Sequence, residues 1–339
     1  MTAPPFSVLD LAPVATGSTT GEALRACVNL AQLTERLGYH RYWVAEHHNM
    51  PGIASSSPAV LVSHIAAATS VMRVGSGGVM LPNHPTLVVA EQFGMIEALN
   101  PGRVDLGMGR APGTDRATAE ALRRAAEPAS PQDFERLIRE LVALFDGTFP
   151  SRHPYARILP VPARGNAPEF WVLGSSDFSA QVAASIGLPF AFAHHLGPTK
   201  TVPAVELYRS LFRRSRRLLE PRVMVAVGVL CAGSDEEARH LAEPNRLSLL
   251  RLRQGLPSTL PSPEEAAAYP YSPEDLAFAE TATSGYVVGG PDRVRSELDR
   301  LIEATKADEV MITTSTHDPA DRIRSFTAIA EMYGLRPLD

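Results

Sequence analysis

The chain has 339 residues, a formal net charge of -5, 45% hydrophobic residues and 20% charged residues. This composition is typical of a globular protein and excludes disorder as a general description. The acidic balance argues against nucleic-acid binding, and no run of about 18 apolar residues predicts a membrane span. No secretory leader precedes Phe6, and Cys27 and Cys231 lie in apolar stretches, so we expect a cytoplasmic protein with buried free thiols.

Short apolar runs alternate with segments of helical period, which predicts eight βα units and an α/β fold, a (β/α)8 TIM barrel formed by residues 1–339 as one domain. The strands are expected at 6–11, 41–45, 73–80, 103–108, 170–174, 189–193, 222–231 and 309–313. The helices are expected at 21–37, 57–70, 86–99, 131–146, 177–186, 199–219, 291–305 and 318–333. Arg213, Arg214, Arg216 and Arg217 are expected on a solvated helix face.

Two proline-rich stretches, near 148–167 and 243–284, do not fit this repeat and are predicted to be loop insertions. Insertions that follow a barrel strand lie at its C-terminal face, where active sites form. The second stretch is therefore a candidate lid.

Glu46, His47 and His48 follow the second predicted strand. Buried acids and imidazoles need hydrogen-bond partners, so this cluster is a candidate catalytic set. Side chains alternate along a strand, so only one of the two imidazoles is expected to face a ligand. A metal site would need further ligands on later strands, which the sequence does not offer, and no metal is predicted.

Glycines and one arginine mark the next two strand ends. Gly77 and Gly78 lie inside the third predicted strand, where glycine favours a bulge or a close approach of backbone to ligand. Gly109 and Arg110 end the fourth strand, and a guanidinium among small residues suits a phosphate or a carboxylate. A packed barrel corner and a surface salt bridge remain the structural alternatives.

Leu173, Gly174, Ser175 and Ser176 join the fifth strand to a predicted helix. Free N–H groups and two hydroxyls at a helix start favour a phosphate, whereas Asp177 would repel one unless it caps the helix. A second anion site is possible at residues 289–291, where two glycines and a proline precede a helix. No G-x-G-x-x-G or Walker A motif follows a strand, which argues against a tightly held dinucleotide.

Taken in chain order, these motifs resemble the bacterial-luciferase-like flavin monooxygenases over about residues 6–335, especially a single-chain bacterial branch that includes polyketide-tailoring enzymes. The resemblance implies that His47, beside Glu46 and His48, is a catalytic base near FMN. It further implies that Gly77–Gly78 packs on the isoalloxazine, often through a cis bond, and that Arg110 binds the phosphate. The other implied cofactor contacts are Gly109, Leu173, Gly174, Ser175, Ser176, Phe178 and His194.

Two departures from luciferase, Gly109 in place of a reactive cysteine and Gly174 in place of an acid, mean that light emission is not implied. The family resemblance implies a homodimer that buries the helix at 58–68, and FMNH2 delivered by a separate flavin reductase. O2 would form a flavin C4a-hydroperoxide that epoxidises, hydroxylates or inserts oxygen into a small molecule, with an aromatic natural product as one candidate. The alternatives are an F420-dependent hydride-transfer enzyme and a non-catalytic flavin-binding protein.

Overall fold

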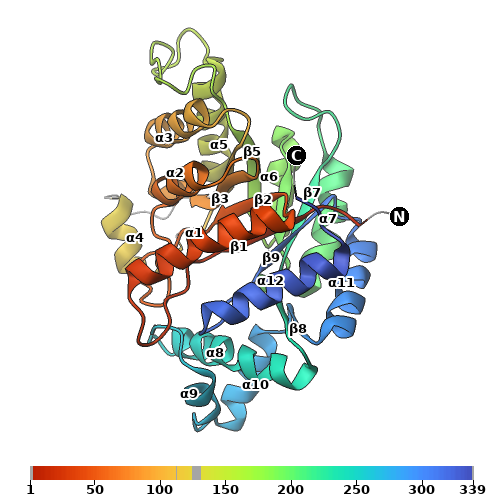
Figure 1. The fold of residues 1–339 in the computed structure, drawn as a ribbon. Coiled ribbons are helices and arrows are strands. Elements are labelled where there is room, and N and C mark those ends of the chain that lie inside the picture. Colours follow the sequence, from red (N-terminus) through yellow and green to blue (C-terminus); the bar gives the residue numbers. More distant parts are fainter. Residues whose placement is uncertain (1–2, 112, 124–130, 338–339) are drawn as a thin grey trace.

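Eight parallel strands close into a barrel in the computed structural model, which describes residues 3–111, 113–123 and 131–337 (Figure 1). The pairing of β6 with β7 and of β1 with β9 completes the ring, so the predicted (β/α)8 TIM barrel is confirmed. The barrel strands are β1 (Phe6–Asp10), β2 (Arg41–Val44), β3 (Arg73–Met80), β4 (Val104–Gly109), β5 (Glu169–Gly174), β6 (Phe190–Ala193), β7 (Val223–Cys231) and β9 (Glu309–Thr313).

A ninth strand, β8 (Tyr286–Gly289), was not predicted. It pairs with residues 228–231 of β7, just beyond residues 223–226, where β6 pairs with the same strand. The segment is four residues long and lies outside the βα repeat, which is why its sequence pattern is weak. It extends the sheet above the barrel mouth.

Helices surround the barrel on its outer side (Figure 1). Those that complete the repeat are α1 (Thr20–Leu37), α2 (Pro58–Ala68), α3 (Thr86–Leu99), α5 (Pro131–Asp146), α6 (Asp177–Ile186), α7 (Thr201–Leu211), α11 (Pro291–Thr305) and α12 (Pro319–Tyr333). Short 3-10 turns follow β3 and β6: η1 (Leu81–Asn83), η2 (His194–Leu196) and η3 (Pro198–Lys200). Among the described residues, no helix has both the length and the apolar composition needed to cross a membrane.

The prediction of a loop over 243–284 is wrong. This part of the chain contains the second half of α8 (Asp235–Arg253), α9 (Pro263–Ala267) and α10 (Pro273–Ala282), while α4 (Arg116–Arg123) is a further unpredicted helix. Pro263 and Pro273 occupy the first helical positions after the capping residues Ser262 and Ser272, so these prolines start helices instead of breaking them. The stretch 148–167 contains neither an α-helix nor a strand.

Helix α7 ends at Leu211, so the expected helix over 199–219 is too long and its arginine cluster is not on a helix. Arg214 instead forms an ion pair with Glu220. Arg217 is paired with Asp146 and lies 4.5 Å from the centre of the Phe170 ring. The arginine cluster therefore lies on an irregular connection between α7 and β7.

The barrel interior is filled from its N-terminal end. Arg41 is fully buried there, with its guanidinium 2.7 Å from Asp105 and 2.6 Å from Glu309. Above this ionic layer, Trp43 and Trp171 pack edge to face, with ring centres 5.6 Å apart. The next inward positions carry smaller side chains, at Ala45, Gly77, Gly109, Ala191, Ala193 and Ala226. Because small residues cannot fill the ring, a cavity opens toward the C-terminal ends of the strands.

Candidate functional site

The cavity at the C-terminal mouth of the barrel has a volume of about 490 Å³. Its lining includes nine of the predicted site residues, from β2, β3, β4, β5 and the turns that follow them: His47, Gly77, Gly78, Gly109, Arg110, Leu173, Gly174, Ser175 and Ser176. Residues separated by more than 100 positions in the sequence therefore face one space. Glu46, His48, Phe178 and His194 are not part of the lining.

One corner of the cavity combines features that suit a phosphate. The guanidinium of Arg110 lies 4.8 Å from the centre of the Phe178 ring and forms no ion pair with a described acid. Ser176 caps α6 without using its hydroxyl on the backbone, so Asp177 is the first helical residue and not the cap. The first N–H groups of α6, two serine hydroxyls and a cation are thus available to a dianion.

The glycines of β3 form a wall of this cavity. The Gly77–Gly78 peptide bond is cis, as the family resemblance implied. A Cβ atom on Gly78 would lie 2.7 Å from the carbonyl oxygen of Gly107, and one on Gly77 would lie 2.7 Å from a methyl carbon of Leu9. A side chain at position 78 would clash with backbone, and one at position 77 would need Leu9 to move, so this part of the cavity is bounded by bare backbone, against which a planar ring can pack.

His47 is the imidazole of the Glu-His-His run that lines the cavity. Its Nδ1 lies 3.3 Å from the carbonyl oxygen of Gly113 and donates to it, since a carbonyl only accepts. Burial lowers the pKa of His47, which favours the neutral ring at neutral pH. The neutral ring then carries its free lone pair on Nε2, as a general base requires.

Glu46 and His48 lie behind this position. The Glu46 carboxylate is fully buried and accepts hydrogen bonds from His48 at 2.9 Å, from His84 at 2.8 Å and from the N–H of Met80 at 2.9 Å. Burial alone would raise the pKa of Glu46, but the hydrogen bond from His84 and its other partners lower it. Glu46 therefore joins the ends of β2 and β3, and this geometry suits a positioning role. His84 was not singled out from the sequence, although it follows the glycine strand closely.

The end of β6 carries two histidines, of which His195 and not His194 lines the cavity. His194 forms a 2.7 Å hydrogen bond with Thr201. His195 donates from Nδ1 to the carbonyl oxygen of Ala226 at 3.1 Å, and burial lowers its pKa to about 4. The alternation of side chains along a strand predicts that only one of these two histidines faces the cavity, but it does not say which of them does.

Sequence reasoning also missed the opposite wall. One face of α8 contributes Asn245, Ser248, Leu249 and Leu252, which follow helical spacing, and β8 contributes Tyr286. This spacing was present in the sequence, but the prolines nearby led to the prediction of a loop. The amphipathic pattern of α8 would have identified these residues.

The glycine pair before α11 is not available to an anion. Asp235 accepts a hydrogen bond from the N–H of Gly290 at 2.7 Å, and this bond helps to lower the pKa of the carboxyl. The chain's own carboxylate therefore occupies the helix start. Among the described residues, no group of three or more His, Cys, Asp or Glu side chains could hold a metal ion.

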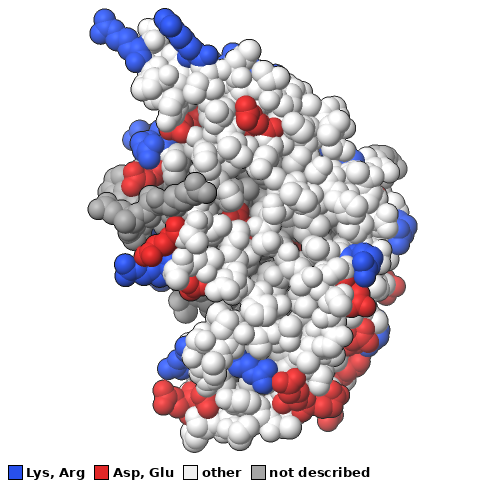
Figure 2. Space-filling view, turned by 90° about the vertical axis from the view of Figure 1, so that its left-hand side faces the viewer, with Lys and Arg blue, Asp and Glu red and all other residues white. Residues whose placement is uncertain are grey.

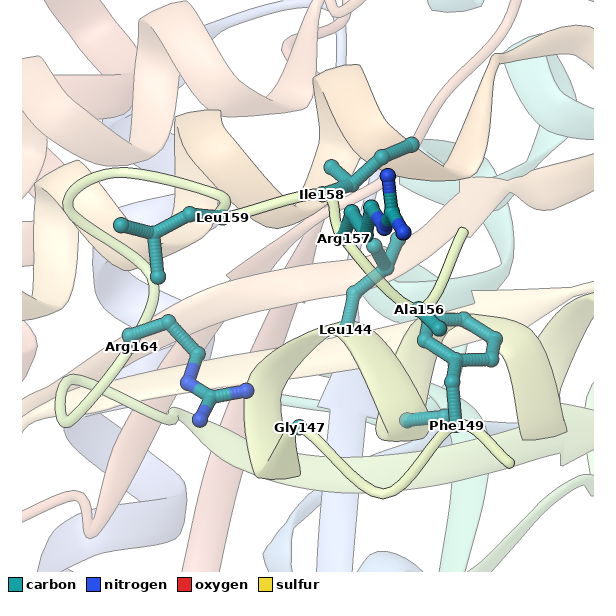
Figure 3. A pocket seen from close by; sticks show the side chains of 9 residues that line it. Leu144, Gly147, Phe149, Ala156, Arg157, Ile158, Leu159 and Arg164 are labelled. Atoms are coloured by element: carbon teal, nitrogen blue, oxygen red, sulfur yellow. The ribbon is translucent and has the colours of Figure 1, made fainter. Parts of the chain in front are cut away.

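A second hollow, of about 200 Å³, lies between the end of α5 and the stretch 148–167 (Figure 3). It contains Arg157 and Arg164 but none of the predicted site residues. Both arginines are exposed, and Arg164 lies against Gly147 at the C-terminus of α5. A cation suits a helix C-terminus, so this hollow has a structural explanation.

The sequence profile of the luciferase-like monooxygenases matches residues 5–309 of this chain. A luciferase-like monooxygenase of Escherichia coli K12 is 44% identical over 321 residues, which cover 95% of this chain and 94% of that protein. An N-acetyl-S-alkylcysteine monooxygenase of Bacillus subtilis is 34% identical over 331 residues, or 96% of this chain and 97% of that protein. The solved structure of apo-MsnO8 is similar with a TM-score of 0.90 at 39% identity, over 99% of this chain and 100% of that one.

Proposed function

Because the chain belongs to the luciferase-like monooxygenase family, we propose that it is an FMNH2-dependent enzyme that uses O2 to oxygenate a small organic substrate. The observation that carries this proposal is the arrangement of the barrel mouth. Arg110, Ser175 and Ser176 face the same cavity as the Gly77–Gly78 wall. A phosphate group and a planar ring would both find partners there.

The described residues fit reduced FMN. Arg110, the two serine hydroxyls and the start of α6 would hold the phosphate, and the bare backbone of Gly77–Gly78 would contact the isoalloxazine. When bound, reduced flavin supplies the electrons that activate O2. The protein supplies position, proton transfer and a dry environment.

His47 is proposed as the group that moves a proton. Its lowered pKa keeps the ring neutral at neutral pH, so it is ready to accept a proton at Nε2 and return it later. Glu46 and His48 are proposed as positioning residues, because they fix the backbone on either side of His47 without lining the cavity. Leucines from β1 and α8 line the same space and help to exclude water from it.

The charge of the cavity favours FMN over F420. Arg110 is the only Lys or Arg among the described residues of the lining. One guanidinium suffices for one phosphate group, whereas the acidic tail of F420 would need several cations. Hydride transfer with F420 is therefore the weaker candidate.

We also propose a cytoplasmic homodimer that receives FMNH2 from a separate flavin reductase by diffusion. The side chains that support a dimer are the exposed Val60 on α2 and the exposed Val88, Met95 and Leu99 on α3. These helices lie next to each other (Figure 1), and the upper part of the face in Figure 2 is mostly uncharged. An exposed apolar surface of this kind favours association with a second copy.

Anaerobic titration with photoreduced FMN, followed by mixing with air, tests the proposed activity. The protein is expected to bind FMNH2 and to change the rate at which the absorbance of oxidised flavin returns, relative to FMNH2 alone. An unchanged rate, together with reduction of F420 by alcohols in the presence of the protein, would contradict the proposal.

A further inference from the structure

We propose that the organic substrate is an electrically neutral, largely apolar molecule with one oxygen function, bound between α8 and the end of β6. This inference rests on the proposed function, because it assigns Arg110 to the flavin phosphate. It concerns the half of the cavity that lies away from that corner.

The described lining offers no charge to a second ion. It contains no Asp or Glu, and its only Lys or Arg is Arg110. The imidazoles of His47 and His195 are held neutral, since burial lowers the pKa of each. A carboxylate or an ammonium buried without a partner costs far more than a neutral group, so a charged substrate would bind poorly.

The charges of α8 are directed elsewhere. Asn245, Ser248, Leu249 and Leu252 form the stripe that faces the cavity. Three of the four arginines of this helix form ion pairs outside the lining: Arg246 with Glu243 at 2.7 Å, Arg251 with Glu265 at 2.9 Å and Arg253 with Glu274 at 3.5 Å. The fourth, Arg239, donates to the backbone oxygen of Asp235 at 3.0 Å. None of these arginines lines the cavity, so none is placed to neutralise a substrate carboxylate.

Neutral hydrogen-bonding groups are present on the same side. The hydroxyl of Ser248 is buried without a hydrogen-bond partner, and that of Tyr286 forms no hydrogen bond with a described residue. Tyr286 lies edge to face with His195, at 6.2 Å between ring centres, and His195 keeps an acceptor on Nε2 because its Nδ1 donates to Ala226. A carbonyl oxygen would accept hydrogen bonds from the hydroxyls of Ser248 and Tyr286, and a hydroxyl could in addition donate to Nε2 of His195.

Apolar side chains surround this polar group. Leu249, Leu252 and Leu260 line the cavity on one side, and Met311 lies on β9 at the barrel interior. They would contact the hydrocarbon part of the substrate. The expected ligand class therefore differs from the acidic substrate that the name of the Bacillus subtilis relative implies.

The test compares three ligands of similar length, 2-nonanone, octanoate and octylammonium, by calorimetric titration at pH 7.5. The Arg110→Ala variant is used beside the unmodified chain, because octanoate could otherwise bind at the phosphate corner. We expect 2-nonanone to bind both proteins equally, and at least tenfold more tightly than either ion binds the variant. Equal or tighter binding of either ion, or no measurable binding of the ketone, would overturn the proposal.

A substitution pair locates the site. Both Leu252 and Leu256 are partly exposed, at 44% and 64%, but only Leu252 lines the cavity. Leu252→Trp is therefore expected to fill the proposed subsite and abolish ketone binding, whereas Leu256→Trp is expected to leave it unchanged. Tyr286→Phe is expected to raise the dissociation constant of 2-nonanone several-fold without changing the melting temperature of the protein. If Leu252→Trp still binds the ketone, the substrate site does not lie between α8 and the end of β6. Since these titrations use no flavin, loss of FMNH2 binding with intact ketone binding would instead contradict the flavin proposal alone.

Discussion

Arg110 is the residue on which the proposed recognition of the flavin phosphate depends. It stacks on Phe178, forms no ion pair with a described acid, and faces the same cavity as two serine hydroxyls. A guanidinium left free at the mouth of a barrel is available for an anionic ligand. Phe178 contributes by holding the guanidinium and does not line the cavity itself.

Buried His195 should make stability depend on pH. Its pKa falls from 6.5 to about 4 on folding. Between these values the unfolded chain takes up a proton that the folded chain does not, so stability decreases as pH falls from 6.5 toward 4. The His195→Gln variant has no ionisable ring at this position. Between pH 7.5 and pH 5, its free energy of unfolding should therefore fall by about 1–2 kcal/mol less than that of the unmodified chain. This range allows for the fact that the ring borders a cavity that water can enter.

Urea unfolding at the two pH values measures this difference. His240→Gln, at an exposed position of α8, is the control and should follow the unmodified chain. If the free energy of unfolding changes equally with pH in the unmodified chain and in His195→Gln, the lowered pKa of His195 would be contradicted.

Much of the cavity lining could be predicted residue by residue from the sequence. His47 and Arg110 follow strand ends, and Gly77 and Gly78 lie in the second half of β3, so their positions follow from the βα repeat. Which member of an adjacent histidine pair faces the cavity depends on the local twist, so His194 was chosen where His195 lines the space. The hydrogen bond from His84 to Glu46 joins the ends of two different strands, so no pattern in the local sequence predicts it.

At the scale of elements, the ionic layer at the N-terminal end of the barrel holds several strands together. Arg41 on β2 contacts Asp105 on β4 and Glu309 on β9. Burial alone would raise the pKa of Asp105, but Arg41 and Arg73 outweigh it and hold this pKa below its usual value. The layer is therefore stable only while each charge keeps its partners.

Arg41→Met should destabilise the protein by about 3–5 kcal/mol, because each of two buried carboxylates, Asp105 and Glu309, loses one of its two guanidinium partners. The matched control is Arg116→Ala, which removes an exposed pair with Glu120 and should cost under about 0.5 kcal/mol. Chemical unfolding measures both. A loss for Arg41→Met as small as that of the control would contradict this role of the layer.

Strands with continuous apolar runs and helices with clear caps were the elements that could be predicted. Gly38 ends α1 in the left-handed conformation with φ 89°, and Ser57 and Pro58 begin α2, as expected from their sequence. The helices between β7 and β8 were missed because proline was interpreted as a breaker, although after a capping serine it starts a helix. Pro244 lies inside α8, where tertiary contacts override its low propensity.

On the scale of the whole molecule, the proposed dimer makes a distinct prediction. Val60 on α2 is 70% exposed, and Met95 and Leu99 on α3 are 53% and 71% exposed. Val60→Glu combined with Met95→Glu should give a monomer in sedimentation velocity, because burying two carboxylates in an interface is unfavourable.

Leu219→Glu is the control for this experiment, since Leu219 is 68% exposed but lies between α7 and β7. It should leave the dimer intact. A monomeric unmodified chain, or a double variant that still forms a dimer, would contradict the proposed interface.

Whether the Arg110 corner binds the flavin phosphate is tested by comparing reduced FMN with reduced riboflavin, which differ by one phosphate. Anaerobic titration of the unmodified chain should give tighter binding of FMNH2 by about 1.5–3 kcal/mol, the range for hydrogen bonds to a charged group. Arg110→Ala should remove most of this difference, whereas Arg157→Ala, at the outer hollow, should preserve it. Equal affinity of the unmodified chain for the two flavins would mean that no phosphate is bound at this corner.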